Sequence, residues 1–208
     1  MKTVLIHGSG HRADSWKETA ARLEGQGDIL CPELSVILHG KEASCPNLCA
    51  AFAEYCNSLE GPLHLCGLSL GGILALEYAL AFPEKVKTLV LIGTPHRVPR
   101  LLFGVQNLVF RLLPRSAFRT MAFGKRDTFL LGDSMKTLDF SGRVEAISCP
   151  TLLLCGEKDR ANLKSARYFK DHIRGAELRI LPGAGHIVNE EAPAALAGIL
   201  NEYYAGHL

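Results

Sequence analysis

The amino-acid sequence predicts an α/β fold: a doubly wound, mostly parallel sheet of about six strands, with helices on both faces and a short helical cap. Two observations predict it. Short runs rich in leucine and β-branched residues alternate along the chain with longer segments of helical pattern. Most of these runs are apolar throughout, as is typical of strands covered on both faces. The length of 208 residues and a composition of 48% hydrophobic and 21% charged residues fit a single domain over residues 1–208.

The expected elements follow one another in regular alternation. Strands are expected at residues 3–6, 28–31, 63–66, 88–92, 151–154 and 178–181. Helices are expected at residues 15–23, 47–58, 70–81, 161–172 and 193–204. The last helix opens on Pro193, a residue suited to a first helical turn. Right-handed crossovers between these strands give one sheet.

Residues from about 95 to 140 interrupt this alternation. They contain no clear strand, but apolar residues recur at helical spacing within them. An insertion of this length between two strands indicates a cap over the carboxyl edge of the sheet, where open α/β sheets bind ligands. Leu101, Val105 and Leu108 are the residues expected to line a pocket there. The alternative is that this apolar face only covers the core of the sheet.

Composition and charge exclude several classes of protein. A formal net charge of +2 gives no case for nucleic-acid binding. The first apolar run is too short for a signal peptide, and no run approaches the roughly 20 residues of a transmembrane helix. The seven cysteines follow no disulfide ladder and no zinc-binding spacing, so we expect buried thiols, no metal and a reducing compartment. The sequence therefore predicts a cytoplasmic location.

The segment Gly67-Leu68-Ser69-Leu70-Gly71-Gly72 is the strongest chemical signal in the chain. It joins the expected strand 63–66 to the expected helix 70–81. A serine in such a sharp strand-to-helix turn needs small neighbours, and its hydroxyl is exposed at a helix N-terminus. Ser69 is therefore the candidate nucleophile. The alternative is a glycine-rich turn that serves packing alone.

A serine hydroxyl needs a general base, and the chain has eight histidines. His186 follows the last expected strand, so it is expected at the same sheet edge as Ser69. His172 falls on an expected helix, His39 and His96 lie in loops without flanking strands, and His207 lies almost at the end of the chain. His186 is therefore the candidate base.

The acid that orients the histidine is expected after another strand. Glu157 and Asp159 both follow the expected strand 151–154, and Asp159 is preferred because two further loop residues let it reach His186. Its alternative role is to cap the helix that starts near Ala161, a role that Asn162 can also fill.

Backbone N–H groups are the candidates for stabilising an oxyanion. One belongs to Leu70, directly after the nucleophile. The other belongs to Ser9, in the small-residue loop His7-Gly8-Ser9-Gly10 after the first strand.

With these residues the chain resembles the α/β-hydrolase superfamily over nearly its whole length. The matching residues are His7-Gly8-Ser9-Gly10 with Trp16 downstream, the elbow Gly67–Gly72, Gly156-Glu157-Lys158-Asp159, Gly185-His186 and Glu191-Ala192-Pro193. The resemblance implies acyl-enzyme chemistry by Ser69, Asp159 and His186, without metal or organic cofactor. The sequence opens at what corresponds to the third strand of that family, and its cap is short. A serine at the elbow argues against dehalogenase and epoxide-hydrolase chemistry, which needs an aspartate there.

The expected activity is hydrolysis of a small or medium carboxylic ester. Lactonase, thioesterase and carbon–carbon bond hydrolase activities would use the same residues and stay open as alternatives. The alternative from another class is a ligand-binding module of the same fold with little turnover, because fold alone does not fix function.

The stretch from residue 97 to residue 127 within the cap region is also unusually basic, because seven cations stand there against one acidic residue, Asp127. These cations are Arg97, Arg100, Arg111, Arg115, Arg119, Lys125 and Arg126. A solvated face is one interpretation. The other is attraction of an anionic substrate or an anionic lipid surface.

Overall fold

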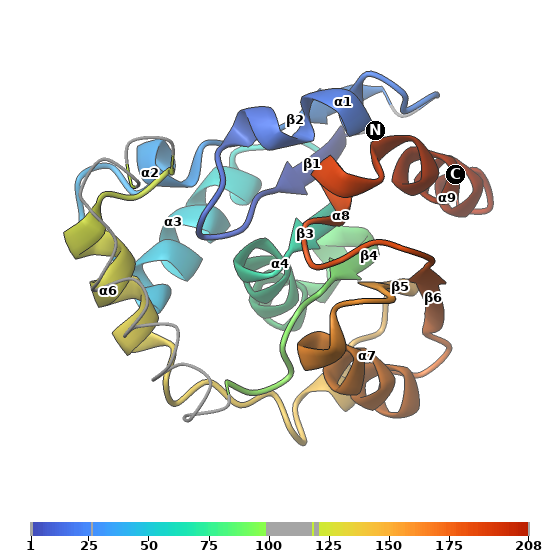
Figure 1. Cartoon of the computed structure of the whole chain (residues 1–208). Helices are drawn as coiled ribbons and strands as arrows, with labels where there is room; N and C mark the ends of the chain where they lie inside the picture. Colours follow the sequence, from blue (N-terminus) through green and yellow to red (C-terminus); the bar gives the residue numbers. More distant parts are fainter. Residues whose placement is uncertain (1, 26, 99–117, 119–120, 208) are drawn as a thin grey trace.

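The computed structural model describes residues 2–25, 27–98, 118 and 121–207, and it contains one sheet of six strands (Figure 1). The strands are β1 (Lys2–Ile6), β2 (Asp28–Leu30), β3 (Leu63–Leu68), β4 (Val86–Ile92), β5 (Thr151–Gly156) and β6 (Glu177–Leu181). Their order is β2-β1-β3-β4-β5-β6, and every neighbouring pair is parallel. The predicted fold class is confirmed. Five of the expected strands lie within observed strands, and the expected strand 28–31 extends one residue beyond β2.

Five helices correspond to the expected ones; the first four precede or join strands, and the last follows β6. They are α1 (Lys17–Ala20), α3 (Cys45–Asn57), α4 (Leu70–Ala81), α7 (Arg160–His172) and α9 (Pro193–Ala205). The bounds of α4 agree with the prediction. The expected helix 15–23 is wrong in extent: a 3-10 turn, η1 (Ala13–Trp16), precedes a single α-helical turn that ends at Ala20.

Five further elements were not predicted individually. They are α2 (Leu34–Ile37), α6 (Lys125–Ser134), α8 (Val188–Glu191), η2 (Pro83–Lys85) and η4 (Val144–Ala146). One of them, α6, lies within the region where a helical cap is expected. Four of them span only three or four residues, and such short helices depend on tertiary packing instead of an amphipathic repeat.

Each face of the sheet has its own apolar core, because successive side chains of a strand point to opposite faces. In β1, Val4 and Ile6 belong to the core under α2, α3, α4 and α6, whereas Leu5 belongs to the core under α1, α8 and α9. The first core continues to Phe169 of α7. The second is closed by Trp16, which is fully buried. Covering on both faces explains why the central strands β3 and β5 are buried at every residue and mostly apolar, whereas the edge strands β2 and β6 are partly exposed and carry Asp28, Glu177 and Arg179.

The order of the strands creates a switch point between β1 and β3. The chain passes from β1 outward to β2, and then returns to β3 on the other side of β1. The loops that leave the carboxyl ends of β1 and β3 therefore diverge, and such a point is where doubly wound sheets bind ligands. These are the loop after Ile6 and the turn at Ser69.

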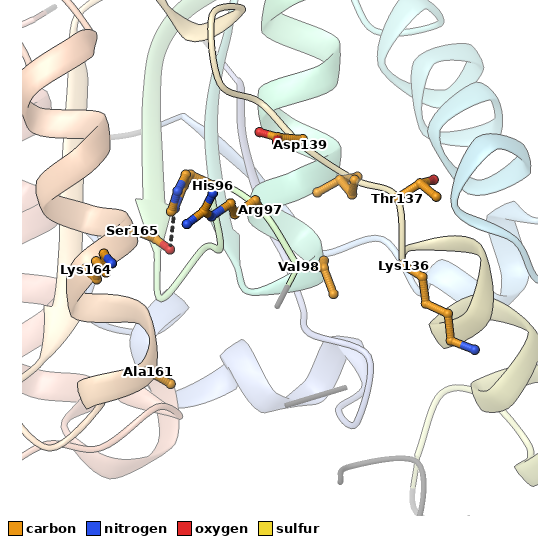
Figure 2. A pocket seen from close by; sticks show the side chains of 10 residues that line it. His96, Arg97, Val98, Lys136, Thr137, Asp139, Ala161, Lys164 and Ser165 are labelled. Atoms are coloured by element: carbon orange, nitrogen blue, oxygen red, sulfur yellow. Dashed lines mark hydrogen bonds between the residues drawn. The ribbon is translucent and has the colours of Figure 1, made fainter. Parts of the chain in front are cut away.

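The two ends of the region 95–140 lie side by side. Val98 N–H donates to the Leu138 carbonyl (3.1 Å) and Phe140 N–H donates to the His96 carbonyl (2.8 Å), which forms an antiparallel bridge between Arg97 and Asp139. A cavity of about 470 Å³ lies against this bridge and α7 (Figure 2). Leu101, Val105 and Leu108 fall outside the described residues, so their role in a pocket stays a prediction.

Among the described residues, no helix has the length and apolar character needed to cross a membrane. All seven cysteines are free thiols. Cys45 and Cys49 share a face of α3, and their sulfur atoms are 3.9 Å apart.

Candidate active site

Ser69 occupies the turn between β3 and α4 with a strained backbone. Its φ of 55° and ψ of −110° lie in a region that residues with a side chain rarely adopt, at a cost of about 1–3 kcal/mol. The turn is held by the Ser69 N–H, which donates to the Ile92 carbonyl at 2.8 Å. Ser69 is half-buried and precedes the first residue of α4. The geometry is that of a serine presented at a helix N-terminus, as the sequence predicts.

Gly71 lets α4 start so close to the sheet. A Cβ atom at this position would collide with the Ile6 carbonyl and lie 2.9 Å from the His7 carbonyl oxygen. Both groups are backbone atoms at the end of β1 and cannot move aside. The glycine thus brings the start of α4, and Ser69 with it, against the loop that follows β1.

The loop after β1 is fixed by His7, which is fully buried. Its Nδ1 lies 2.9 Å from the Gly8 carbonyl oxygen, and its Nε2 accepts the Leu34 N–H at 3.1 Å. These partners assign the proton to Nδ1. Burial lowers the pKa of His7 and outweighs the Gly8 carbonyl and Glu33, which act to raise it.

This fixation sets the direction of the Ser9 N–H. The Gly8 carbonyl faces His7 and also accepts the His11 N–H at 3.2 Å. In a trans peptide the carbonyl and the following N–H point in opposite directions, so the Ser9 N–H points away from His7. A Cβ on Gly8 would lie 3.6 Å from the Ser69 Cβ, which places this loop directly beside Ser69.

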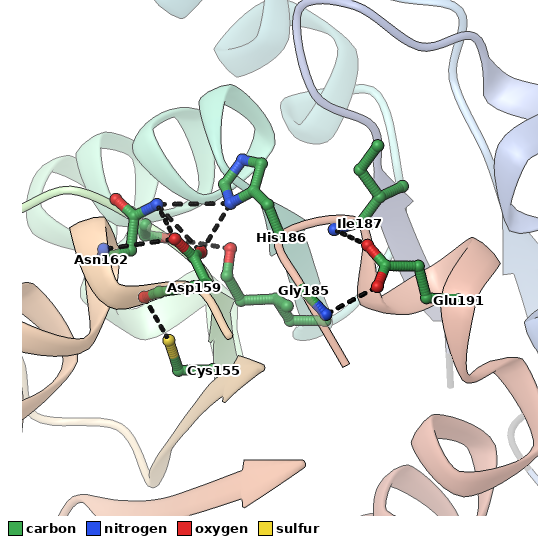
Figure 3. Close-up of polar contacts among 9 residues, drawn as sticks. Cys155, Asp159, Asn162, Gly185, His186, Ile187 and Glu191 are labelled. Atoms are coloured by element: carbon green, nitrogen blue, oxygen red, sulfur yellow. Dashed lines mark hydrogen bonds and ion pairs between the residues drawn. The ribbon is translucent and has the colours of Figure 1, made fainter. Parts of the chain in front are cut away.

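His186 and Asp159 form a short, well-aligned pair (Figure 3). The His186 Nδ1 and Asp159 Oδ2 atoms are 2.6 Å apart. The Asp159 side chain is 5% exposed, whereas that of His186 is 38% exposed. A buried carboxylate on Nδ1 fixes the tautomer and leaves Nε2 free to accept a proton.

Asp159 also caps α7, so its two candidate roles coexist. Its Oδ1 accepts the Asn162 N–H at 3.3 Å, and the Asn162 side-chain amide donates to Oδ1 and Oδ2 at 3.0 and 2.9 Å. The expectation that Asn162 can be the cap is wrong, because Asn162 supplies the donors. Burial raises the pKa of Asp159, but the hydrogen bonds from His186 and Asn162 outweigh it and lower the pKa below its ordinary value.

Glu157, the other carboxylate considered, serves the neighbouring turn. Its Oε2 accepts the Gly183 N–H at 2.8 Å, and the residue is exposed. It therefore holds the turn that leads from β6 toward His186, and it does not contact the imidazole.

Gly93 links Ser69 to the acid–base pair. It directly follows Ile92, whose carbonyl holds the Ser69 N–H. A Cβ on Gly93 would lie 3.0 Å from the His186 ring and 3.1 Å from Asp159 Oδ2. Ser69 and His186 are thus brought to the same sheet edge. The Ser69 hydroxyl makes no hydrogen bond to another residue that the structure describes, and such bonds are often longer in an enzyme without substrate.

Glu191 is a supporting residue whose role the sequence did not reveal. Its two carboxylate oxygens accept the Gly185 N–H at 2.6 Å and the Ile187 N–H at 3.1 Å, on both sides of His186 (Figure 3). The sequence showed Glu191 only as part of a matching segment. Spacing alone cannot show that a carboxylate five residues after the histidine turns back to hold its loop.

The described residues contain no group of three histidine, cysteine, aspartate or glutamate side chains that could hold a metal ion. Of the seven basic residues named above for the predicted cap, the structure describes Arg97, Lys125 and Arg126. Arg100, Arg111, Arg115 and Arg119 lie outside the described residues, so attraction of a lipid surface by the cap stays a prediction.

Comparisons with known proteins agree with this architecture. Residues 3–199 match the family model described as "Alpha/beta hydrolase family". A putative 2-succinyl-6-hydroxy-2,4-cyclohexadiene-1-carboxylate synthase of Bacillus subtilis is 27% identical, over 96% of this chain and 89% of the relative. A pimeloyl-[acyl-carrier protein] methyl ester esterase of Nitrosospira multiformis is 28% identical, over 59% of this chain and 61% of the relative. The solved structure of a thermophilic esterase from Thermogutta terrifontis superposes with a TM-score of 0.78 and 20% identity, covering 100% of this chain and 91% of the esterase.

Proposed function

The chain belongs to the alpha/beta hydrolase family and is a hydrolase, and from this premise we propose that it cleaves a carboxylic ester of small or medium size through an acyl-enzyme on Ser69. One observation carries the proposal. The strained Ser69 turn, the Asp159–His186 pair and the loop of Ser9 all lie at the carboxyl edge of the sheet, with Ser69 and Ser9 at its switch point and Gly93 between Ser69 and the pair.

In the proposed mechanism His186 acts first as a base. Its Nε2 takes the proton of the Ser69 hydroxyl while the oxygen attacks the ester carbonyl. Asp159 stays ionised, holds Nδ1–H and stabilises the imidazolium. The imidazolium then gives its proton to the departing alkoxide. In the second half, His186 takes a proton from water while the water oxygen attacks the acyl carbonyl. The imidazolium then returns the proton to Ser69 Oγ as the bond from Ser69 to the acyl group breaks and the acid leaves.

The oxyanion formed in both halves is assigned to two backbone N–H groups. Leu70 N–H is among the first N–H groups of α4, which have no partner within the helix. Ser9 N–H points away from His7, and it belongs to the loop that lies beside Ser69. Losing one such donor costs about 3–4 kcal/mol of transition-state stabilisation.

An ester assay tests this proposal. We expect p-nitrophenyl esters of graded chain length to be turned over, and Ser69→Ala to lower kcat by about 10⁴- to 10⁶-fold. Ser58→Ala, at an exposed serine beyond the end of α3, is the matched control and should keep full activity. Full activity in Ser69→Ala would exclude this serine as the nucleophile.

A second candidate comes from the Bacillus subtilis relative, whose name is that of a synthase and which aligns with almost the whole chain. The same serine and histidine would then serve a reaction other than ester hydrolysis. Lactones, thioesters and carbon–carbon bonds are further substrates that these residues fit. Specific labelling of Ser69 without turnover of any ester would favour one of these reactions. Stoichiometric ligand binding with negligible product would instead favour a binding module.

A further inference from the structure

The cavity of about 470 Å³ is lined by the loop after β4, by residues 136–139 and by the start of α7, the helix that Asp159 caps. One wall is formed by His96, Arg97 and Val98, which follow Gly93, the residue against the His186 ring. The opposite wall is formed by Ala161, Lys164 and Ser165 of α7, whose Asn162 contacts His186 at 3.2 Å. Ser165 lies three residues after Asn162, which is about 5 Å along the helix. The cavity and the acid–base pair are therefore built on the same two elements, the loop after β4 and the first turns of α7.

The charges around the cavity are mainly positive. Three cations, Arg97, Lys136 and Lys164, line it with one carboxylate, Asp139. Lys136 is already paired with Asp133 at 2.6 Å, and Asp139 accepts the Ser141 N–H at 2.8 Å. Arg97 and Lys164 form no ion pair with a carboxylate among the described residues. They stand on opposite walls (Figure 2). A hollow with one dominant sign of charge concentrates ions of the other sign.

The floor between these cations is rigid and polar. His96 is 7% exposed, and its Nδ1 lies 2.9 Å from the Ser165 hydroxyl, which is 5% exposed overall. The His96 ring stacks on Tyr168, with ring centroids 4.4 Å apart. Burial lowers the pKa of His96, and Arg97 and Lys164 lower it further against the opposite effect of Asp139.

We propose that this cavity binds the anionic end, a carboxylate or phosphate group, of the substrate that the Ser69 site cleaves, with Arg97 and Lys164 as the receiving cations. The inference rests on the proposed function and narrows its substrate class to esters that carry a negative charge away from the scissile bond. It is independent of the basic residues of the predicted cap, except for Arg97. Lys164 belongs to α7, and sequence patterns gave no reason to select it.

Matched pairs of methyl esters test the proposal. Monomethyl glutarate and monomethyl adipate carry a carboxylate where methyl pentanoate and methyl hexanoate carry a methyl group, and released methanol reports all four. We expect the wild-type chain to prefer the charged member of each pair in kcat/KM. Arg97→Gln and Lys164→Gln should each lower the charged-to-neutral ratio by about 3- to 10-fold, as the loss of one partly exposed charge contact implies. Lys17→Gln, on α1 and the other face of the sheet, should leave the ratio unchanged. An unchanged ratio in both cavity variants would overturn the proposal.

Direct binding separates this proposal from the proposed function. Titration calorimetry of the full chain carrying Ser69→Ala should show saturable binding of glutarate. The affinity should decrease as salt is added. Adding Arg97→Gln or Lys164→Gln should raise the Kd by about 3- to 10-fold. Competition by acetate or by inorganic phosphate identifies which anion the site prefers. If no ester is cleaved but glutarate binds in this way, the subsite stands and the ester-hydrolase proposal fails. If esters are cleaved by Ser69 but glutarate binding is absent, or equal in all variants, only the subsite fails.

Discussion

The two halves of the candidate active site are held by different means. The half that carries Ser69 depends on backbone geometry: a positive φ at Ser69, a glycine at position 71 and a backbone hydrogen bond to Ile92. The half that carries His186 depends on side chains: Asp159, Asn162 and Glu191 make six hydrogen bonds to the imidazole, the flanking N–H groups and one another. Rigidity at the nucleophile is thus built from steric restriction, and rigidity at the base from a polar network.

This difference has a mechanistic reason. The nucleophile must present one oxygen at a fixed place, and a strained turn between a buried strand and a buried helix does so without further polar groups. The base must receive and return a proton, so its ring needs partners that stabilise its charged form while leaving one nitrogen free. Substitutions should therefore affect the two halves differently.

Asp159→Asn should have the largest effect of the substitutions that test this comparison. We expect kcat to fall about 10⁴-fold, because an amide does not hold the tautomer that the base needs. Asparagine is as good a helix cap as aspartate, so the start of α7 should remain stable. Asp159→Ala should lose similar activity and a further ~1 kcal/mol of the free energy of unfolding. Steady-state kinetics and urea unfolding of both variants measure these effects. Retention of more than a tenth of the activity in Asp159→Asn would contradict the role given to the carboxylate.

Gly71→Ala tests the half that depends on backbone geometry. The added methyl group would meet the Ile6 carbonyl, so we expect a loss of about 3 kcal/mol in the free energy of unfolding and a melting temperature lower by about 6–12 °C. Gly198→Ala is the matched control, because it is also helical and its Cβ would meet no atom within 4 Å. It should instead stabilise the protein by about 0.5–1 kcal/mol. Calorimetric melting of both variants tests this prediction. Equal changes in melting temperature for the two variants would contradict the steric argument.

Glu191→Gln should have a smaller effect, confined to the polar half. A glutamine has one acceptor oxygen, so it can hold only one of the two N–H groups beside His186 as the carboxylate does. We expect kcat to fall about tenfold, by analogy with other residues that orient a functional histidine, while the rate of stoichiometric Ser69 labelling falls in proportion. Glu190→Gln, at the exposed neighbouring position, serves as the control. A rise in KM with unchanged kcat would show that Glu191 acts on substrate binding instead.

The smallest effect is a pH dependence of stability from His7. Because the pKa of His7 is lower in the folded protein than the ordinary value of 6.5, the unfolded chain binds the proton more readily. Its contribution to stability is therefore complete above about pH 6.5 and decreases as the pH falls toward the folded pKa. Urea unfolding at pH 7.5 and pH 5 should show a smaller loss in His7→Gln than in the wild type. An identical pH dependence would contradict a neutral, buried His7.

The sequence was sufficient for the sheet and for the backbone-held half of the site. The central strands were predicted because burial on both faces leaves a continuous apolar signal, and the partly exposed edge strands β2 and β6 were predicted from shorter apolar runs. The glycines around Ser69 predicted a tight turn because few other residues fit one. The identities of Asp159 and His186 followed from their positions after strands. The structure brings these two together, while their catalytic roles remain to be measured.

The supporting network could not be predicted in the same way. Asn162 and Glu191 act through side chains that turn back onto Asp159 and the His186 loop, and no periodic pattern records such a contact. Lys164 and Arg97 are 67 positions apart and meet across a cavity only after β5 and α7 are packed. Contacts of this kind depend on the tertiary fold, which a local pattern does not contain.

The central claim, that Ser69 is a nucleophile activated by His186, is tested most directly by covalent labelling. Intact-mass spectrometry after treatment with a fluorophosphonate should show one adduct per chain, and peptide mapping should locate it on Ser69. Ser69→Ala should remain unlabelled, and His186→Ala should label far more slowly. An adduct on another residue, or equal labelling of the wild type and Ser69→Ala, would contradict the claim.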